Sequence, residues 1–427
     1  MISIYQSEAF QQEVLTKKTQ NEQDEEVFQV AKNVIADIRT NGDQALKKYV
    51  KKFDQHVPTE WKVTDQERKD AWNQVEARTI LALKNAAKNI KAFHEKQLQS
   101  SRFMQVDEDI VSGQLYRAIE KVGIYVPGGT ACYPSSVLMN AIPAVLAGVE
   151  EVIMVTPARN GENIAPILSV AADIAGVTTI YKIGGIQAIA ALAYGTETVP
   201  TVDKIVGPGN AYVAAAKALV FGDVGIDMVA GPSEVAIIAD DSADPIHVAA
   251  DLIAQAEHDT NARSFLFTPS AELIEATKKE LEQQTAVLPR EDIARVSLEE
   301  KGGLVLVSDL DEAFVLSNQL APEHLEIQLN NPLDYLGKIK HAGSVFLGHY
   351  TPESLGDYYA GPNHVLPTSG TARFSSGLSV DDFIKKTTFL YYSEKALTDA
   401  AEDIVTIANE EYLVGHARAV EKRLKKN

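Results

Sequence analysis

One stretch of the sequence, Ser242 to Thr260, combines a packing face with side chains that could bind a metal ion. Asp244 is suited to capping a helix and Pro245 to beginning one, so a helix is predicted from Pro245 onward. At helical spacing, one side of it carries His247, Asp251, Gln255 and His258. The other side carries Ile246, Val248, Ala249, Leu252, Ile253 and Ala256. Gln255 and His258 lie one turn apart and can reach a single point, which favours a metal site. An exposed polar stripe with two ordinary histidines is the alternative.

Further polar groups stand in the last third of the chain. Glu323 precedes His324 in APEHLEI, which we expect to be a loop at a strand end that bends to present both side chains. The long segment GHYTPESLGDYYAGPNHVLPTSGTARFSSG has the Gly, Pro, Ser and Thr content of an ordered functional loop and contains Asp357 and His364. Glu411 and His416, near the C-terminus, would point about 140° apart on a regular helix. They can serve one site only if the backbone bends, or a helix begins, between them.

Three glycine turns each follow an apolar run, at Gly128-Gly129, at Gly184-Gly185, and at Gly207 with Gly209. Glycines there would let the backbone approach a ligand at the carboxyl ends of parallel strands. None of the turns contains the full G-x-G-x-x-G pattern of a dinucleotide site. Tight turns that bind no ligand are therefore an open alternative.

The elements that must position these groups change type along the chain. Residues 1 to about 100 have helical patterns, of which EEVFQVAKNVIADIRT stops at the turn signal Asn41-Gly42. From about Glu120, apolar runs alternate with helical patterns, as in parallel βαβ units. We expect an α/β protein with two Rossmann-like, incomplete, mostly parallel domains, one inserted in the other, plus helical N- and C-terminal segments.

The expected division of the chain has four parts. Residues 1–24 form an N-terminal helical segment, and residues 25–122 with 234–377 form a discontinuous α/β domain. Residues 123–233 form the inserted Rossmann-like domain. Residues 378–427 form a C-terminal helical segment.

Composition restricts the class of protein. The chain has 427 residues, of which 45% are hydrophobic and 23% charged, as in proteins with large cores. A formal net charge of −19 argues against a nucleic-acid partner, which needs clustered Lys and Arg. No apolar run approaches a membrane span, and MISIYQSEAF lacks the features of a signal peptide, so we expect a cytoplasmic protein. The single cysteine, Cys132, excludes an internal disulfide framework and a Cys-rich zinc cluster.

Taken together, several motifs resemble those of the histidinol dehydrogenase family, over roughly residues 25 to 420. They are GIYVPGGTACYPSSVLMNAIPA, KIGGIQAIAALAYGT, DKIVGPGNAYV, DMVAGPSEV, AQAEHD, QLAPEHLEI, TPESLGDYYAGPNHVLPTSGTARFSSGLSVDDF and EEYLVGH. No single motif would be specific, but the combination is.

The resemblance implies an enzyme that oxidises L-histidinol to L-histidine, the last steps of histidine biosynthesis. It implies two NAD-dependent steps through L-histidinaldehyde and one Zn²⁺ per active site, which positions the substrate. Zinc would be held by Gln255, His258, Asp357 and His416. Because His416 would come from a second subunit, a homodimer with shared active sites is implied. The discontinuous domain would carry zinc and the catalytic residues, the inserted domain would bind NAD, and the C-terminal segment would reach the partner subunit.

Roles for the remaining residues follow from the same resemblance. His324 would take the hydroxyl proton of the alcohol, and Glu323 would activate water for the aldehyde step. Substrate would also contact Ser233, His364 and Glu411, besides His324 and the four zinc ligands. NAD would be bound by Tyr125, Gln187 and Asn210, which lie in or beside the glycine turns.

Three other functions compete with this interpretation. One is a related zinc- and NAD-dependent dehydrogenase of another alcohol, against which the presence of Ser233, Glu411 and His416 argues. Another is a zinc hydrolase, in which Glu323 activates water and the glycine turns are structural. A third, a binding protein without catalysis, is disfavoured by the adjacent Glu323-His324 pair and the full ligand set.

Overall fold

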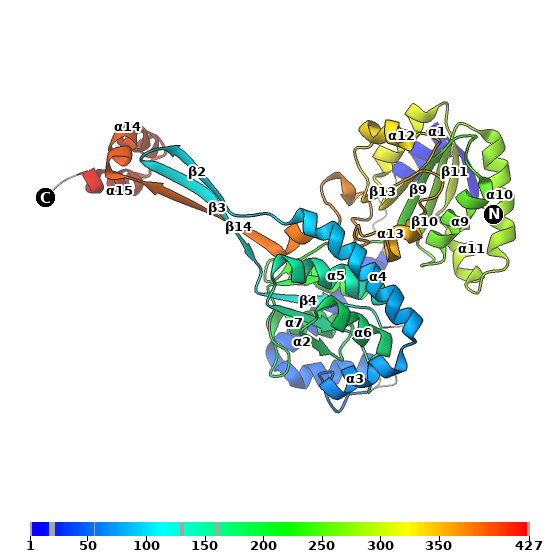
Figure 1. The fold of residues 1–427 in the computed structure, drawn as a ribbon, viewed down its shortest axis with the longest axis horizontal. Helices are drawn as coiled ribbons and strands as arrows, with labels where there is room; N and C mark the ends of the chain where they lie inside the picture. Colours follow the sequence, from blue (N-terminus) through cyan, green and yellow to red (C-terminus); the bar gives the residue numbers. More distant parts are fainter. Residues whose placement is uncertain (1, 17–21, 55, 129–131, 159–161, 425–427) are drawn as a thin grey trace. The chain divides into compact units, whose positions relative to one another are not determined.

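The structure is a computed structural model that describes residues 2–16, 22–54, 56–128, 132–158 and 162–424 (Figure 1). Its internal contacts divide the chain into two compact units. The first comprises residues 1–97 and 119–383, and the second comprises residues 98–118 and 384–427. Among the described residues, no helix is long and apolar enough to span a membrane.

The first unit contains a five-stranded parallel sheet with the order β6-β5-β4-β7-β8. Its strands are β4 (Lys121–Tyr125), β5 (Glu151–Val155), β6 (Thr179–Tyr181), β7 (Lys204–Val206) and β8 (Gly225–Ile226). The helices that connect them are α5 (Pro134–Ala147), α6 (Pro166–Ala175), α7 (Gly185–Tyr194) and α8 (Ala211–Val220). Counted along the chain, this is the order 3-2-1-4-5 of a Rossmann fold, whose ligand crevice lies where β4 and β7 adjoin.

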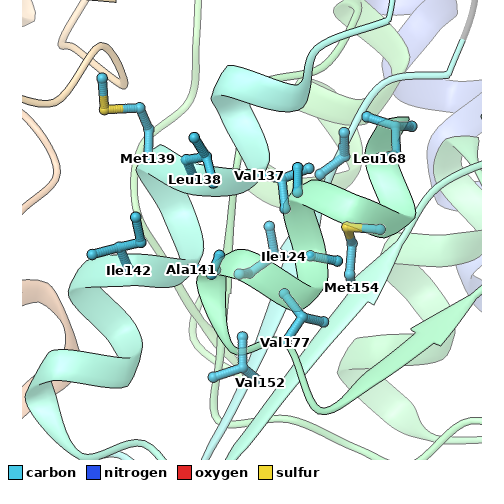
Figure 2. Packing of buried hydrophobic residues seen from close by; sticks show 14 of the residues in the cluster. Ile124, Val137, Leu138, Met139, Ala141, Ile142, Val152, Met154, Leu168 and Val177 are labelled. Carbon is cyan, nitrogen blue, oxygen red and sulfur yellow. The ribbon is translucent and has the colours of Figure 1, made fainter. Parts of the chain in front are cut away.

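Both faces of this sheet are covered by helices, so its strands are apolar on both sides. On one face, Ile124 and Met154 pack against residues of α5 and α6, including Val137 and Leu168, as Figure 2 shows. On the other face, residues such as Ile153 and Ile205 pack against α7, α8 and the long α2.

Three helices that precede the sheet in the chain complete these layers. They are α2 (Glu22–Phe53), α3 (Asp65–Gln74) and α4 (Ala77–His94). Helix α2 contacts α7 and α8, α3 contacts α6, and α4 contacts α5 and α6. The sequence grouped residues 25–122 with residues 234–377, whereas these helices bury their apolar faces on the sheet of residues 121–226.

The helix end expected at Asn41-Gly42 is present as a kink, where two helical stretches join within α2. Helix α2 runs on to Phe53, but Gly42 has φ 48° and ψ −129°, outside helical geometry. A Cβ at Gly42 would lie 2.6 Å from Glu197 Oε2, which accepts the backbone N–H of Asp43. The turn signal therefore marks a bend at which the helix changes direction.

The first unit also contains a six-stranded parallel sheet with the order β1-β11-β10-β9-β12-β13. Its strands are β1 (Ser3–Gln6), β9 (Glu234–Ala239), β10 (Arg263–Thr268), β11 (Gly303–Leu306), β12 (His324–Gln328) and β13 (Ser344–Leu347). Its helices are α1 (Ser7–Phe10), α9 (Pro245–Ala256), α10 (Ala271–Thr285), α11 (Glu291–Glu300), α12 (Leu310–Leu320) and α13 (Glu353–Tyr358). Residues 1–24, expected to be helical, thus supply an edge strand as well.

Short helical turns complete the first unit. They are the π-helix η1 (Gln11–Leu15) and the 3-10 helices η2 (Glu95–Gln97), η3 (Pro332–Lys338), η4 (Thr371–Arg373) and η5 (Val380–Phe383).

The second unit is a three-stranded antiparallel sheet with two helices. Its strands, in the order β14-β3-β2, are β2 (Arg102–Asp107), β3 (Ile110–Ala118) and β14 (Ile384–Tyr392). The helices are α14 (Glu394–Glu410) and α15 (Val414–Leu424). The sequence predicted the helices but not β14, a strand that lies within the C-terminal segment.

The predicted fold class, α/β with two parallel sheets, is confirmed. The antiparallel sheet of the second unit is the main element absent from the prediction.

Candidate active site

The candidate catalytic and metal-binding residues of the first unit gather where the strands of the six-stranded sheet begin. His324, the first residue of β12, is in register with Val235 of β9 and Ser344 of β13. Helix α9 runs back across the sheet, so its last turn, with Gln255, reaches this same amino-terminal edge. Binding sites of parallel sheets usually lie at the opposite, carboxyl edge.

Three side chains at this edge could share a metal ion. His258, Glu353 and Asp357 offer ligand atoms that all lie within 4.8 Å of one another. Glu353 and Asp357 are four residues apart on α13, so they project from the same helix face. The sequence singled out His258 and Asp357. It missed Glu353, which only its spacing from Asp357 in PESLGD could have indicated.

Gln255 lies beside this group and has no exposed surface. With its amide oriented so that the nitrogen donates, that nitrogen lies 2.7 and 2.9 Å from the two carboxylate oxygens of Glu353. His258 follows the end of α9 instead of lying within it, and its N–H donates to the Gln255 carbonyl. Ile246, expected on the packing side of the helix, is 52% exposed.

The charge states of two of these groups suit a cation. The side chain of His258 is exposed, yet the protein atoms around it partly desolvate the ring and lower its pKa, which favours the neutral imidazole that a metal ion requires. Burial alone would raise the pKa of Asp357, but the neighbouring imidazoles, His324 first among them, lower it. Asp357 is therefore an ionised carboxylate.

Glu323 and His324 meet at one buried point, where 6% and 4% of their surfaces remain exposed. Both are held by the backbone of Glu234. Its N–H donates to Glu323 Oε2 at 3.0 Å, and its carbonyl accepts from His324 Nδ1 at 3.1 Å. Since a carbonyl only accepts hydrogen bonds, His324 Nδ1 must carry a proton to make this contact. The other ring nitrogen, Nε2, takes no part in it. Nε2 has no hydrogen-bond partner within the described residues and lies 3.7 Å from Asp357 Oδ1.

Burial also shifts the proton affinities of this group. It raises the pKa of Glu323 to about 7 and that of Glu353 to about 8. Burial would lower the pKa of His324, but the carboxylates of Glu353, Glu323 and Asp357 outweigh it and raise this pKa well above its ordinary value. The site thus contains groups that gain and lose protons near neutral pH, as acid–base catalysis requires.

Two further predicted residues border the same site. Ser233 immediately precedes β9, and its carbonyl accepts the N–H of Arg263. His364 Nδ1 donates to the Asp357 carbonyl at 3.0 Å, and its Nε2 lies 3.2 Å from Ser136 Oγ at the start of α5. Ser136 had no distinguishing sequence signal.

The three candidate nucleotide residues lie at the carboxyl edge of the five-stranded sheet. The Tyr125 hydroxyl, at the end of β4, accepts the N–H of Gly185 at 3.1 Å. Gln187, fully buried in α7, donates to Asp54 at 3.3 Å, and its Oε1 has no partner within the described chain. Asn210 caps α8 by accepting the N–H of Val213. The sequence missed Asp54, whose pKa burial raises to about 6.

One of the three glycine turns is only partly described, because Gly129 lies outside the described residues. In the second turn, a Cβ at Gly184 would lie 2.8 Å from Pro157, and the third turn approaches β4 closely. A Cβ at Gly207 would lie 2.2 Å from the Tyr125 carbonyl oxygen, and Gly207 has φ +110°.

Glu411 and His416 belong to the second unit, where both are exposed. Helix α14 ends at Glu410 and α15 begins at Val414, with Tyr412 at φ 61° between them. The helix break that the sequence required between these two residues is present.

Comparison with known proteins gives a consistent set of relatives. Residues 17–424 match the family model described as histidinol dehydrogenase. The chain is 53% identical to histidinol dehydrogenase from Bacillus cereus, covering 96% of this chain and 95% of that one. It is 52% identical to the Streptococcus mutans enzyme, covering 94% of each chain. A crystal structure of histidinol dehydrogenase from Elizabethkingia anophelis is similar with a TM-score of 0.92 and 40% identity, covering 99% of this chain and 98% of that one.

Proposed function

The chain belongs to the histidinol dehydrogenase family, and from that premise we propose that it oxidises L-histidinol to L-histidine, through L-histidinaldehyde, in two NAD-dependent steps. These are the last steps of histidine biosynthesis. The observation that best supports the chemistry is the buried pair Glu323 and His324 beside the donor groups of His258 and Asp357.

We propose one zinc ion per active site, held by Gln255, His258, Asp357 and His416 of the partner subunit. The donors fit zinc, which binds imidazole nitrogen and carboxylate oxygen, and the lowered pKa of His258 favours its neutral form. Zinc held there would bind the amino group and an imidazole nitrogen of histidinol, and its charge would offset the carboxylates that raise the pKa of His324.

His324 serves as the base of the first oxidation. With Nδ1–H fixed on the Glu234 carbonyl, Nε2 is the atom that takes the proton of the substrate hydroxyl. NAD held beside the carbinol carbon would accept a hydride from it, which would leave the aldehyde.

Glu323 serves as the base of the second oxidation. It removes a proton from water as the water oxygen attacks the aldehyde carbon. A second NAD would accept a hydride from the resulting hydrate, which would leave the acid. The Glu234 N–H holds the Glu323 carboxyl in place during this step.

NAD binds at the carboxyl edge of the five-stranded sheet, at Tyr125, Gln187 and Asn210. Support comes from the strand order, which puts a ligand crevice between β4 and β7, and from the close turn at Gly207. The unpartnered Gln187 Oε1 is a buried acceptor available to a ligand.

The substrate also contacts Ser233, His364 and Glu411, in addition to His324 and the zinc ligands. Ser233 adjoins the start of β9. His364 Nδ1 donates a hydrogen bond to the backbone carbonyl of Asp357. Glu411 lies five residues before His416, so we assign both to the partner subunit's contribution.

The functional protein is a homodimer that takes a small-molecule substrate. The second unit, considered by itself, exposes large apolar side chains that water would disfavour. On the sheet these are Phe103, Met104, Leu390 and Tyr391, and near α14 and α15 they are Ile407, Tyr412, Leu413 and Val414. A second copy of the chain would cover them and bring His416 to the neighbouring site.

NADH production tests the proposal. Purified protein with bound zinc should form two NADH for each histidinol consumed, and a chelator should stop turnover. Formation of no NADH at saturating histidinol and NAD would contradict the proposed activity. Oxidation of a different alcohol in preference to histidinol would replace the substrate but retain the chemistry.

A further inference from the structure

We propose that Glu353 is a positioning residue that fixes the amide of Gln255, so that its oxygen and not its nitrogen is presented as a metal ligand. The proposal rests on the metal site proposed above and adds a residue that is not among its four proposed ligands.

The contact itself is specific. In the orientation that satisfies both groups, the Gln255 amide nitrogen lies 2.7 Å and 2.9 Å from the two Glu353 oxygens. A carboxylate accepts hydrogen bonds, whereas an amide can turn either its oxygen or its nitrogen to a neighbour. Opposite the ionised carboxylate of Glu353, only the nitrogen gives a favourable contact. The same orientation turns the amide oxygen toward donors, where an amide nitrogen would be repelled.

Orientation matters here because only the amide oxygen can bind zinc. Gln255 is fully buried, so a wrongly oriented amide could not be satisfied by water. A carboxylate that holds the far end of a ligand is the usual way in which proteins orient metal-binding side chains.

Glu353 is itself held in place. Its backbone N–H donates to Glu326 Oε1 at 2.8 Å. Glu326 in turn accepts from Gln328 at 2.9 Å, and Gln328 also donates to Asp251 at 2.8 Å.

These bonds close a ring through three elements. Asp251 lies on α9, one turn before Gln255, and Glu353 lies on α13, one turn before Asp357. The side chain of Glu353 therefore joins the helix that carries the amide ligand to the helix that carries the carboxylate ligand.

A double-variant cycle tests the proposal through metal affinity. The variants are Glu353→Gln, Gln255→Glu and the two combined, and zinc affinity is measured by competition with a chromogenic chelator. Glu353→Gln should weaken zinc binding by ~10- to 100-fold, because an amide at position 353 no longer selects one orientation of Gln255. In the Gln255→Glu protein, the same substitution should strengthen binding, because the amide introduced at position 353 can donate to the new carboxylate. The visible spectrum of the Co²⁺-loaded proteins should follow the same pattern.

A reversal of sign between the two backgrounds is the result that a structural role alone would not give. If Glu353→Gln weakens binding in both backgrounds, Glu353 is a direct ligand or a packing residue, and the proposal is overturned. Glu257→Gln is the matched control, since it removes the same charge next to His258 at a residue that does not hold the Gln255 amide. An equal loss of affinity in this control would also overturn the proposal.

The wild-type protein separates this inference from the proposed function. If wild type binds no stoichiometric zinc, the metal site itself is wrong. If wild type binds zinc and the cycle shows no reversal, only the role of Glu353 is wrong. Circular dichroism checks that each variant is folded, which we expect because Gln and Glu have nearly the same shape.

Discussion

At the residue scale, the site is defined by buried carboxyl groups. Glu323, Glu326 and Glu353 each have at most 6% of their surface exposed, and burial raises the pKa of all three. Burying acids is costly unless a cation or a shared proton compensates. Such a concentration of buried acids beside two imidazoles is explained better by a role in catalysis or metal binding than by packing of the protein core.

The raised pKa of Glu323 predicts a pH dependence for the aldehyde step. Glu323 must be ionised to act as a base, and its pKa is about 7. The rate of histidinaldehyde oxidation should therefore rise with pH through about 7 and level off above it. Glu323→Gln should slow this step by ~10²- to 10⁴-fold and remove the pH-dependent rise. Stopped-flow measurement of NADH from supplied aldehyde distinguishes these outcomes.

Stability provides the control for this variant. The folded-state pKa of Glu323 lies above its ordinary value of 4.5, so the folded state binds the proton more tightly than the unfolded state. The resulting stabilisation is present at low pH and is lost as pH rises through about 7. Glu323→Gln should thus be as stable as wild type or more stable above that pH. A rise in rate that survives in Glu323→Gln would assign the titration to another group.

At this scale the sequence nominated candidates where spacing or adjacency carried a signal. The predicted helix side pointed to His258, and adjacency pointed to Glu323 and His324, whereas the assignment of Gln255 as a ligand came from the family resemblance. Glu353 could not be singled out, because its role depends on a contact with Gln255 across ninety-eight positions of the chain. Ser136 and Asp54 were missed for the same reason.

At the element scale, the two halves of the proposed chemistry use opposite edges of their sheets. The proposed bases and metal ligands lie where β9 and β12 begin, and the candidate NAD residues lie where β4 and β7 end. Ligand-binding sites rarely lie at the amino edge of a parallel sheet, because the helix N-termini and the turns that bind anions lie at the carboxyl edge. A metal site does not need a helix N-terminus, since side chains supply its ligands.

The turn at Gly207 gives a prediction about NAD binding. An added Cβ would lie 2.2 Å from the Tyr125 carbonyl oxygen, so Gly207→Ala must displace the turn that leads to Asn210. We expect weaker NAD binding and a loss of folding free energy of ~1–3 kcal/mol. Gly222→Ala is the matched control, because Gly222 has φ +108° but open space around its Cβ position. Calorimetry with NAD should show reduced affinity for the first variant alone. Equal NAD affinities in the two variants would contradict a nucleotide role for this turn.

The parallel sheets were predictable because strands buried on both faces are continuous apolar runs that alternate with helices. The strands of the second unit were not. Strand β14, with the sequence IKKTTFLYY, has mostly exposed side chains, so it lacks both the continuous run and the clean alternation. Its pairing partner β3 lies more than 260 residues earlier in the chain.

At the scale of the whole molecule, the proposed site needs two chains. Gln255, His258 and Asp357 belong to the first unit, whereas Glu411 and His416 belong to the second. Nothing in one chain's sequence specifies which copy completes a site, and the family resemblance alone suggested sharing. Exposed apolar side chains on the second unit are consistent with burial in a dimer.

Mixing two inactive variants tests shared sites. Glu323→Gln removes the proposed base in the first unit, and His416→Asn removes the proposed zinc ligand in the second. In a mixed dimer with shared sites, one site receives both defects and the other receives none. When the two variants assemble at random, half of the dimers contain one copy of each. Each such dimer has one intact site out of two, so about a quarter of wild-type activity should return. Co-expression with two affinity tags provides the mixed dimer. No recovery in the purified mixed dimer would contradict the sharing of sites.

The most direct test is anomalous diffraction at the zinc edge from crystals of the zinc-loaded protein. The expected result is one zinc per site in contact with Gln255, His258, Asp357 and His416 of the partner subunit, beside Glu323 and His324. A zinc ion bound elsewhere, or one whose protein ligands all come from a single chain, would contradict it.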